Sequence, residues 1–312
     1  MNPAEPSLAH APNPFARYVL ATRPPFLAVT LGACAIGLAT AHAGGVALQP
    51  LTATLTIVFA LAAHAGANVL NDYYDSRNGT DAANTERLYP FTGGSRFIQN
   101  GVLTESRTLA FGVALMAATV LAGLGLMATC GAELFYIGFA GLFIGWAYSG
   151  PPFRLNSRGL GEVSIWLAWM LVPAGADFVQ RSTFSAQPWI ASAGYALLVT
   201  NILFINQFPD RRADEAAGKR HWVVRLGPEQ ARWIYPAIGL AANLFVVAGV
   251  AAGRLPPHAL AALLALPLTV KASLDLVRHA GTSAKLAPAI QATIGAAIAH
   301  AALLVAGLLA SR

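Results

Sequence analysis

Five of the seven aspartates in the chain stand in two short clusters, and each cluster begins where a long apolar run ends. The first reads NVLNDYYDSRNGTD over residues 68–81, and the second reads NQFPDRRADEAAGKR over residues 206–220. A carboxylate at the edge of an apolar segment is costly to bury without a partner, so a cluster of them indicates a function. Carboxylate oxygens are the protein ligands that Mg²⁺ prefers, usually together with substrate phosphates.

Helical spacing gathers the members of each cluster on one face, because residues three or four apart are neighbours on a helix. These faces hold Asn68, Asp72 and Asp75 in the first cluster and Asn206, Asp210 and Asp214 in the second. Asn71 lies beside the first face, and Gly79 and Gly218 end the two helical stretches. The repeated pattern predicts a weak internal duplication in which the two clusters face each other across a bundle of helices.

Two facing pairs of carboxylates are suited to holding Mg²⁺ against one diphosphate, which the metal neutralises and turns into a good leaving group. Basic residues near the clusters would complete a cradle for the anion; they are Arg77, Arg154, Lys219 and Arg220. In an alternative reading, the acids of either cluster cap a helix end or pair with arginine. Two matching clusters favour the metal site, whose predicted ligands are Asp72, Asp75, Asp210 and Asp214.

The composition indicates what kind of molecule positions these clusters. The chain has 312 residues, of which 56% are hydrophobic and 11% charged, whereas soluble domains carry roughly 25% charged residues. So few charges cannot cover a soluble fold, and so apolar a chain cannot stay solvated in a disordered state. Cys34 and Cys130 both lie in apolar runs, which excludes a disulfide framework and a zinc-ribbon pattern. The composition therefore predicts an integral membrane protein.

Apolar runs of about 20 residues can cross roughly 30 Å of hydrocarbon as helices. We count nine of them, approximately at residues 25–43, 51–70, 107–129, 132–149, 161–180, 188–207, 233–252, 258–277 and 287–309. This predicts an all-α, polytopic membrane protein with one transmembrane domain over residues 1–312, in which residues 1–24 form a cytoplasmic segment that leads into the first span. The nine transmembrane helices would form a bundle around a central cavity open to the cytoplasmic side and to lipid.

The basic residues are distributed unevenly between the two sides of the predicted bundle. Seventeen of the 20 lysines and arginines fall in the N-terminal segment and on the side of the Asp clusters, and the other three are Arg181, Arg254 and Arg312. Cytoplasmic loops carry such an excess, so the N-terminus and the Asp clusters are predicted to face the cytoplasm. The net charge of +6 then reflects membrane topology, and nucleic acid is not expected as a partner.

Two further loops on this side carry residues that can bind anions. The stretch YSGPPFRLNSRGLGE over residues 148–162 places Arg154 and Arg158 after a helix that two prolines end. The stretch PFTGGSRFIQ over residues 90–99 contains Arg96 and two adjacent glycines, whose backbone N–H groups can cradle an anion. Taken alone, the first loop is better explained as a turn that carries positive-inside charges.

These motifs, in this order on nine spans, resemble the UbiA-type intramembrane prenyltransferase superfamily over nearly the whole chain. Members of that superfamily transfer a polyprenyl chain from its diphosphate to an aromatic ring with Mg²⁺ as cofactor. The family motif NDxxDxxxD is matched at Asn71, Asp72 and Asp75. It departs at Gly79, which holds the place of the third aspartate, and Asp81 follows two residues later. Asp81 is therefore a weaker candidate ligand.

The second family motif, DxxxD, and the tyrosine and basic residue at the end of the fourth span complete the resemblance. It implies catalytic roles for Asp72, Asp75, Asp210, Asp214, Tyr148 and Arg154. It implies substrate binding by Asn68, Asn71, Arg77, Arg96, Arg158, Asn206, Lys219 and Arg220. The implied partners are a polyprenyl diphosphate, a small aromatic acceptor and membrane lipid.

In the implied reaction, departure of the diphosphate leaves an allylic cation, which needs a dry cavity with aromatic walls. The candidate wall residues are Tyr73, Tyr74, Phe91 and Tyr148, and the polyprenyl tail would lie between helices next to lipid. His64 stands one helical turn before Asn68 on the same face. Helix packing is the preferred reading for His64, with a place on the cavity wall as the alternative.

Within the superfamily, the GTD ending, the GGS segment and the RGLGE and GKR stretches most resemble the menaquinone branch. Its members prenylate 1,4-dihydroxy-2-naphthoate with loss of CO₂, which implies the inner membrane of a bacterium. The NQFPD lead-in differs from the NNxRD expected in that branch. Prenylation of 4-hydroxybenzoate, homogentisate or a tetrapyrrole therefore stays open as an alternative.

Two other classes of membrane protein also contain pairs of acids. Secondary transporters place them near the membrane midplane beside broken helices, whereas these clusters stand at helix ends beside arginine-rich loops. CDP-alcohol phosphotransferases join both Asp pairs in one short segment, whereas Asp72 and Asp210 are far apart in this sequence. Both differences favour the prenyltransferase reading.

Overall fold

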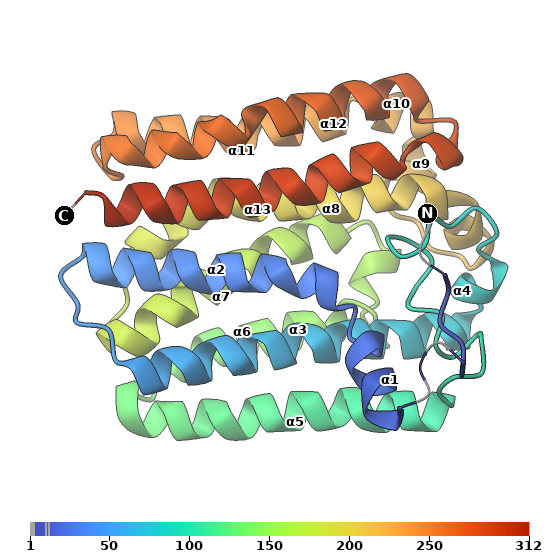
Figure 1. The fold of residues 1–312 in the computed structure, drawn as a ribbon, viewed down its shortest axis with the longest axis horizontal. Coiled ribbons are helices and arrows are strands. Elements are labelled where there is room, and N and C mark those ends of the chain that lie inside the picture. Colours follow the sequence, from blue (N-terminus) through green and yellow to red (C-terminus); the bar gives the residue numbers. More distant parts are fainter. Residues whose placement is uncertain (1–3, 10, 12, 312) are drawn as a thin grey trace.

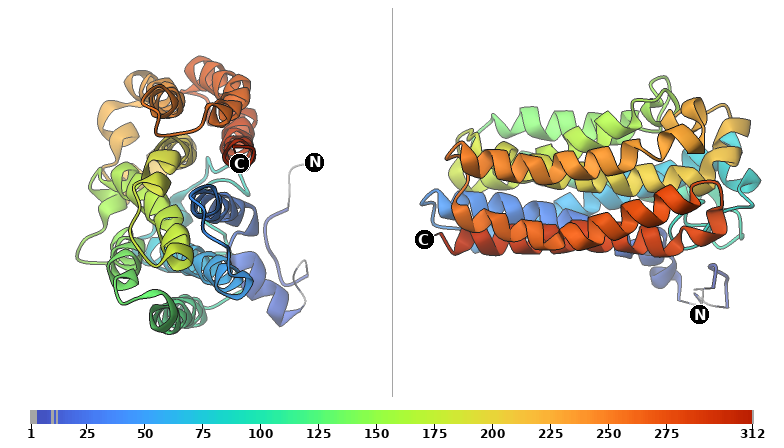
Figure 2. Two further views of the ribbon diagram at one scale, coloured as in Figure 1. Left: turned by 90° about the vertical axis from the view of Figure 1, so that its left-hand side faces the viewer. Right: turned by 90° about the horizontal axis from the view of Figure 1, so that it is seen from above.

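The computed structural model describes residues 4–9, 11 and 13–311, which contain helices and no strands. The long helices run side by side along the length of the molecule, alternating in direction (Figure 1). Viewed along the helix axes, they pack together as a bundle (Figure 2, left). The all-α prediction is confirmed for this part of the chain.

The bundle is built from long helices joined by short ones. The long helices are α2 (Pro24–Ala43), α3 (Pro50–Asn78), α5 (Glu105–Cys130), α7 (Gly161–Arg181), α8 (Gln187–Ala216), α11 (Ile234–Ala251) and α13 (Ala287–Leu309), together with α12 (Leu266–His279), which has 14 residues and continues a preceding 3₁₀ helix. The shorter α-helices are α1 (Pro14–Ala21), α4 (Thr80–Ala83), α6 (Leu134–Ala147), α9 (Trp222–Leu226) and α10 (Pro228–Ala231). Three 3₁₀ helices complete the chain, η1 (Leu155–Ser157), η2 (Pro257–Ala265) and η3 (Ser283–Lys285).

Eight helical stretches in the described residues are long and apolar enough to cross a membrane. Two of them join neighbouring helices: α10 with α11, and η2 with α12. The fourth predicted span, 132–149, differs, because its helix α6 has 14 residues and so extends only about 21 Å. A left-handed Gly131 before it and prolines 151 and 152 after it shorten this helix. The count of nine spans therefore stays a prediction.

Small residues let the helices approach closely, as is common between membrane helices. A Cβ atom on Gly37 of α2 would overlap the Pro173 carbonyl oxygen of α7, and one on Gly194 of α8 would overlap that of Ala242 on α11. Helix α8 lies at the centre, with 78% of its most apolar window buried, whereas α5 lies at the periphery with 11%. The helix that carries the second Asp motif is thus packed against other parts of the bundle on most sides.

Both Asp motifs lie at the same end of the bundle, because α3 and α8 run in the same direction and end there (Figure 1, right). The loops with most of the basic residues connect helices at this end, which we call the Asp end. Arg181 and Arg254 lie at the opposite end, and Arg312 falls outside the described residues. The separation of charge predicted from the sequence is therefore present in the fold.

Candidate active site

A cavity of about 930 Å³ runs between α2, α3, α5, α6, α7 and α8. At the Asp end its wall is polar and includes Asp75, Asp210 and Asp214. Further along, the wall is almost entirely apolar, with residues such as Phe59 and Leu142. The fold therefore joins a charged site to a long apolar space.

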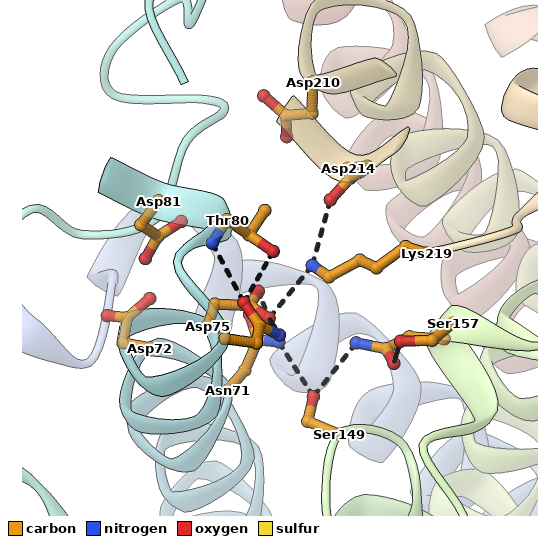
Figure 3. Close-up of polar contacts among 12 residues, drawn as sticks. Asn71, Asp72, Asp75, Thr80, Asp81, Ser149, Ser157, Asp210, Asp214 and Lys219 are labelled. Carbon is orange, nitrogen blue, oxygen red and sulfur yellow. Dashed lines mark hydrogen bonds and ion pairs between the residues drawn. The ribbon is translucent and has the colours of Figure 1, made fainter. Parts of the chain in front are cut away.

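Lys219 connects the two Asp motifs. Its Nζ lies 2.9 Å from Asp75 Oδ1 on α3 and 3.0 Å from Asp214 Oδ1 on α8, as Figure 3 shows. Gly218 makes this possible, since its left-handed backbone turns the chain back so that the Lys219 N–H donates to the Asp214 carbonyl. Burial alone lowers the pKa of Lys219, but the two carboxylates outweigh burial and raise that pKa, so the side chain is a permanent cation. The prediction that the motifs face each other is confirmed.

Neighbouring side chains orient these two carboxylates. Asn71 donates from Nδ2 to Asp75 Oδ2 at 3.1 Å and also contacts Ser149 Oγ at 2.8 Å. On the other side, His221 Nε2 lies 3.1 Å from Asp214 Oδ2. The Val224 backbone N–H donates to His221 Nδ1, so Nε2 carries the proton and donates to Asp214. Asp75 and Asp214 are thus fixed from both flanks.

The loop at residues 84–101 forms hydrogen bonds to both motifs at the Asp end of the cavity. Gly93 N–H donates to Asp210 Oδ2 at 3.4 Å, and Ser95 N–H donates to Asp72 Oδ1 at 3.2 Å. Asn84 Nδ2 donates to Asp210 Oδ1 at 2.5 Å. The GGS segment was predicted to cradle an anion; in the structure its N–H groups bind one carboxylate from each motif.

Asp72 differs from the other motif aspartates because it turns toward a cation outside the motifs. Arg23 NH2, just before α2, lies 3.1 Å from Asp72 Oδ1. Burial lowers the pKa of Arg23, but Asp72 and three other aspartates outweigh this and raise it. Asp72 thus pairs with Arg23 and lies outside the cavity lining, whereas Asp75, Asp210 and Asp214 line the cavity directly.

Asp81, the weaker candidate from the sequence, also lines the cavity and is buried. Burial, reinforced by the carboxylates of Asp75 and Asp72, raises the pKa of Asp81 well above its usual range. A Cβ on Gly94 would overlap the Asp81 carboxylate, and Gly94 also has a left-handed backbone. Glycine is required at that position if the loop is to close over the acid.

Several amide oxygens in the cavity wall have no hydrogen-bond partner within the part of the chain that the structure describes. They are buried and belong to Asn84, Asn206 and Gln207. Asn206 uses its Nδ2 on the Phe91 carbonyl at 3.3 Å, and Asn68 donates to the Thr22 carbonyl at 3.1 Å. Buried acceptors without donors are rare, and a bound cation or a hydrogen-bond donor on a ligand would satisfy them.

The donor set fits Mg²⁺ bound together with a phosphate ligand. No group of three or more His, Cys, Asp or Glu side chains within the described part of the chain is arranged to hold a metal alone. Magnesium rarely uses such a cage and is usually bound by one or two carboxylates plus substrate phosphates. Two cavity-lining carboxylates on α8, with amide oxygens beside them, match that habit.

The predicted arginines do not reach the cavity. Arg77 is exposed and lies 3.6 Å from Glu105, because it stands on the side of α3 away from the site. Arg158 is exposed and donates to the Pro152 carbonyl at 2.8 Å, while Arg154 and Arg220 point outward from their turns. Arg96 is buried and donates to the Asp81 carbonyl, but its Nε lies 3.8 Å from Glu5. Of the predicted cradle, Lys219 therefore lies at the site and the arginines do not, while Arg23 lies beside Asp72.

Of the predicted aromatic wall, Phe91 and Tyr148 line the cavity. Tyr73 and Tyr74 pack against each other, with ring centroids 5.3 Å apart, and lie outside its lining. The Tyr148 hydroxyl is neutral, because a phenol ordinarily loses its proton only at about pH 10. Tyr148 therefore presents a neutral aromatic ring close to the charged end.

Sequence reasoning missed three residues of the site: Arg23, Asn84 and His221. Arg23 and Asn84 reach aspartates that are 49 and 126 residues away in the chain, and no local pattern reports such contacts. His221 follows the GKR stretch directly, so its closeness to Lys219 was the available signal.

The sequence of this chain is similar to those of known enzymes. Residues 30–294 match the UbiA prenyltransferase family. The 2-carboxy-1,4-naphthoquinone phytyltransferase of Synechocystis sp. is 30% identical over 286 residues, which cover 90% of this chain and 87% of the relative. The 1,4-dihydroxy-2-naphthoate octaprenyltransferase of Escherichia coli is 30% identical over 221 residues, or 67% of this chain and 68% of the relative.

Solved structures share the fold. A UbiA homologue from Archaeoglobus fulgidus superposes with a TM-score of 0.66 at 16% identity, covering 95% of this chain and 98% of the other. The same homologue with GPP and Mg²⁺ bound gives a TM-score of 0.62 over 92% and 99% of the two chains. Because the family match spans most of a helical bundle with paired Asp motifs at one end, this chain is a membrane prenyltransferase that belongs to the UbiA prenyltransferase family.

Proposed function

We propose that this enzyme transfers a polyprenyl group from its diphosphate to 1,4-dihydroxy-2-naphthoate, with Mg²⁺ as cofactor. The observation that carries the proposal is Lys219, held between Asp75 and Asp214 at the polar end of a cavity whose other part is apolar. A prenyl diphosphate has the same division between a highly charged head and a long apolar tail. The site and the donor are therefore complementary along their whole length.

The diphosphate head is assigned to the Asp end. Lys219 is the one cation that touches both motifs among the described residues, and it can exchange a carboxylate for a phosphate oxygen without leaving the site. Magnesium bound by Asp75, Asp210 and Asp214 would neutralise the diphosphate and make it a better leaving group. The amide groups of Asn68 and Asn206 flank the same space.

The prenyl tail is assigned to the apolar part of the cavity. Val120 and Leu124 of α5 and Phe139 of α6 line the cavity and are exposed. Exposed apolar side chains in the cavity wall are what an opening toward the membrane requires, and they support one. A long polyprenyl chain can then extend beyond the protein.

The cation formed when the diphosphate leaves requires protection from water. Phe91 and Tyr148 supply aromatic faces near the head group and stabilise positive charge without acting as nucleophiles. The loop at residues 84–101 closes the Asp end through its bonds to Asp72 and Asp210. Excluding water there lets the aromatic acceptor, and not hydroxide, capture the cation.

The choice of acceptor is supported by the relatives. The names of the Synechocystis sp. and Escherichia coli proteins each contain a naphthoquinone or naphthoate substrate. The paired motifs, the GGS loop and the GKR stretch are the features of this chain that resemble that branch. The alternatives of 4-hydroxybenzoate, homogentisate and a tetrapyrrole are outcomes of the assay below.

We place the protein in the inner membrane of a bacterium, as one domain with the N-terminus and the Asp end in the cytoplasm. The uneven distribution of basic residues supports this orientation, since Arg181 and Arg254 lie at the other end. Attaching a cysteine-specific, membrane-impermeant label to single cysteines at residues 101 and 253 tests it. We expect label on position 253 alone in intact cells. Label on position 101 alone would show that the orientation is the opposite of the one proposed.

The activity is tested with the purified full-length chain in lipid, supplied with Mg²⁺, a polyprenyl diphosphate and separate aromatic acids. We expect a prenylated naphthalene product, identified by mass, that needs Mg²⁺ and has lost one carboxyl group. Product with 4-hydroxybenzoate but none with 1,4-dihydroxy-2-naphthoate would overturn the acceptor assignment. Absence of transfer to any aromatic compound would overturn the proposed function.

A further inference from the structure

Part-way along the apolar portion of the cavity, three helices contribute polar side chains at one level. Thr30 of α2 and His64 of α3 are joined by a hydrogen bond of 2.7 Å between Oγ1 and Nδ1. The His64 ring packs edge-to-face with Trp169 of α7, at a centroid distance of 5.0 Å and an angle of 89°. All three residues line the cavity, and we call them the polar cluster.

The indole of Trp169 has an unused hydrogen-bond donor. Its Nε1 is buried and has no partner among the described residues. Trp166, on the same helix, donates its own Nε1–H to the Ala193 carbonyl at 3.3 Å and lies outside the cavity lining. Buried indole N–H groups normally find a partner, so Trp169, which lines the cavity, is the member of this pair whose donor is unused.

His64 offers a second polar group to the same space. Its Nδ1 is engaged by Thr30, and no hydrogen bond to its Nε2 occurs in the described part of the chain. The hydroxyl and the indole fix the ring in orientation, and the side chain is only half-buried. The preferred sequence-based reading of His64 as a packing residue is therefore replaced by the alternative, a place on the cavity wall.

The level of the polar cluster in the bundle suits an aromatic acceptor. His64 precedes Asp72 by eight residues on α3, which separates them by about 12 Å along the helix axis. A diphosphate at the Asp end occupies part of that distance, and the remainder matches a flat bicyclic ring lying across the cavity. One edge of such a ring faces the carbon that loses the diphosphate, and the far edge reaches His64 and Trp169.

We infer that Thr30, His64 and Trp169 form the recognition site for the acceptor, and that they bind a hydroxyl or carbonyl oxygen on the far edge of a bicyclic aromatic compound. This inference rests on the proposed function. Trp169 donates to the oxygen through Nε1, His64 bonds to it through Nε2, and Thr30 holds the imidazole in place. The prenyl tail, which has no polar atoms, gains nothing from these groups.

The test separates the two substrates kinetically. Apparent KM values for 1,4-dihydroxy-2-naphthoate and for geranylgeranyl diphosphate are measured in Trp169→Phe, His64→Leu and Thr30→Val enzymes. Loss of one hydrogen bond to the acceptor predicts a rise of about tenfold in the naphthoate KM for the first two variants, a smaller rise for Thr30→Val and an unchanged KM for the diphosphate. The matched control is Trp166→Phe, in which both KM values are expected to stay within about twofold.

A conservative variant tests for a purely structural role. In His64→Gln the side-chain amide can replace Nε2, and recovery of most of the naphthoate affinity lost in His64→Leu is expected. An unchanged naphthoate KM in Trp169→Phe and His64→Leu, or an equal rise in both KM values, would overturn the inference while the proposed function stands. Absence of transfer by the unmodified enzyme to any aromatic compound overturns the proposed function itself.

Discussion

The two ends of the bundle treat buried acids in opposite ways. At the end away from the Asp motifs, Asp177 of α7 accepts two hydrogen bonds from Arg181, at 2.8 and 2.9 Å, and a third from Thr40 at 3.0 Å. This one carboxylate has its own cation and no unused oxygen. At the Asp end, four buried aspartates and the half-buried Asp210 share two cations that pair with their carboxylates among the described residues, Arg23 and Lys219.

The difference distinguishes an acid that stabilises the fold from acids that can bind a ligand. A bidentate pair between Asp177 and Arg181 is complete within the fold, and nothing further can bind to it. Lys219 is shared between Asp75 and Asp214, and amide oxygens near it lack donors. An incomplete set of this kind can take up a cation and an anion together, as a metal-dependent diphosphate site requires.

The difference between the two ends is tested by removing one acid at each end. We expect Asp75→Ala and Asp214→Ala to lower turnover by about 10³-fold, because loss of a group that stabilises the leaving diphosphate amounts to several kcal/mol. Prenyl transfer by purified enzyme at saturating Mg²⁺ measures this. Near-normal turnover in either variant would remove that aspartate from the site.

Asp177→Asn is the matched variant at the other end. It leaves Arg181 without its carboxylate and is expected to lower the free energy of unfolding by about 1–3 kcal/mol, while turnover per folded molecule is unchanged. Thermal unfolding in detergent, together with the same transfer assay, measures both quantities. A variant that is stable but inactive would show that the opposite end also takes part in the chemistry.

A smaller effect on activity is expected when His221 is replaced. This residue orients Asp214 and is not itself a proposed metal ligand. Replacing the partner of a metal-binding carboxylate typically weakens metal affinity by about 10–100-fold. We expect His221→Gln to raise the Mg²⁺ concentration for half-maximal activity by about tenfold and to leave the maximal rate close to normal. A Mg²⁺ titration of prenyl transfer distinguishes this result from a general loss of activity.

Asp81 predicts a pH dependence of stability. Its pKa is raised in the folded protein, so the folded state holds a proton that the unfolded state has lost, and stability declines as pH rises from the ordinary pKa of Asp toward the raised one. With metal chelated, Asp81→Asn is expected to flatten this decline and to raise the unfolding temperature at neutral pH by a few degrees. Thermal unfolding between pH 4 and pH 8 checks the sign, and a steeper decline in the variant would contradict it.

The smallest effect is expected outside the cavity. Arg77 and Arg154 are both exposed, and surface substitutions usually change stability by less than about 0.5 kcal/mol. Neither side chain lines the cavity, so Arg77→Ala and Arg154→Ala should also keep the KM for the prenyl diphosphate within about twofold. A tenfold rise in that KM would instead support the cradle of arginines that the sequence motifs predict.

The placement of these basic residues shows where sequence reasoning succeeds and where it stops. The spacing of Asp72, Asp75 and Asn68 correctly predicts one helix face, since helical periodicity is local. Arg77 follows Asp75 by two residues and so lies about 200° around the helix, which the same periodicity could have predicted. Arg23 could not be found in this way, because it meets Asp72 across 49 residues of chain.

The membrane setting, the all-helical fold, the uneven charge and the two Asp motifs with their family follow from composition, periodicity and local spacing alone. Which cations complete the site depends on the tertiary structure, because Gly218 must turn Lys219 back between two helices before it can bridge Asp75 and Asp214. The polar cluster likewise exists only when α2, α3 and α7 pack together. Local sequence determines what each helix can offer, and long-range packing decides which of these groups meet.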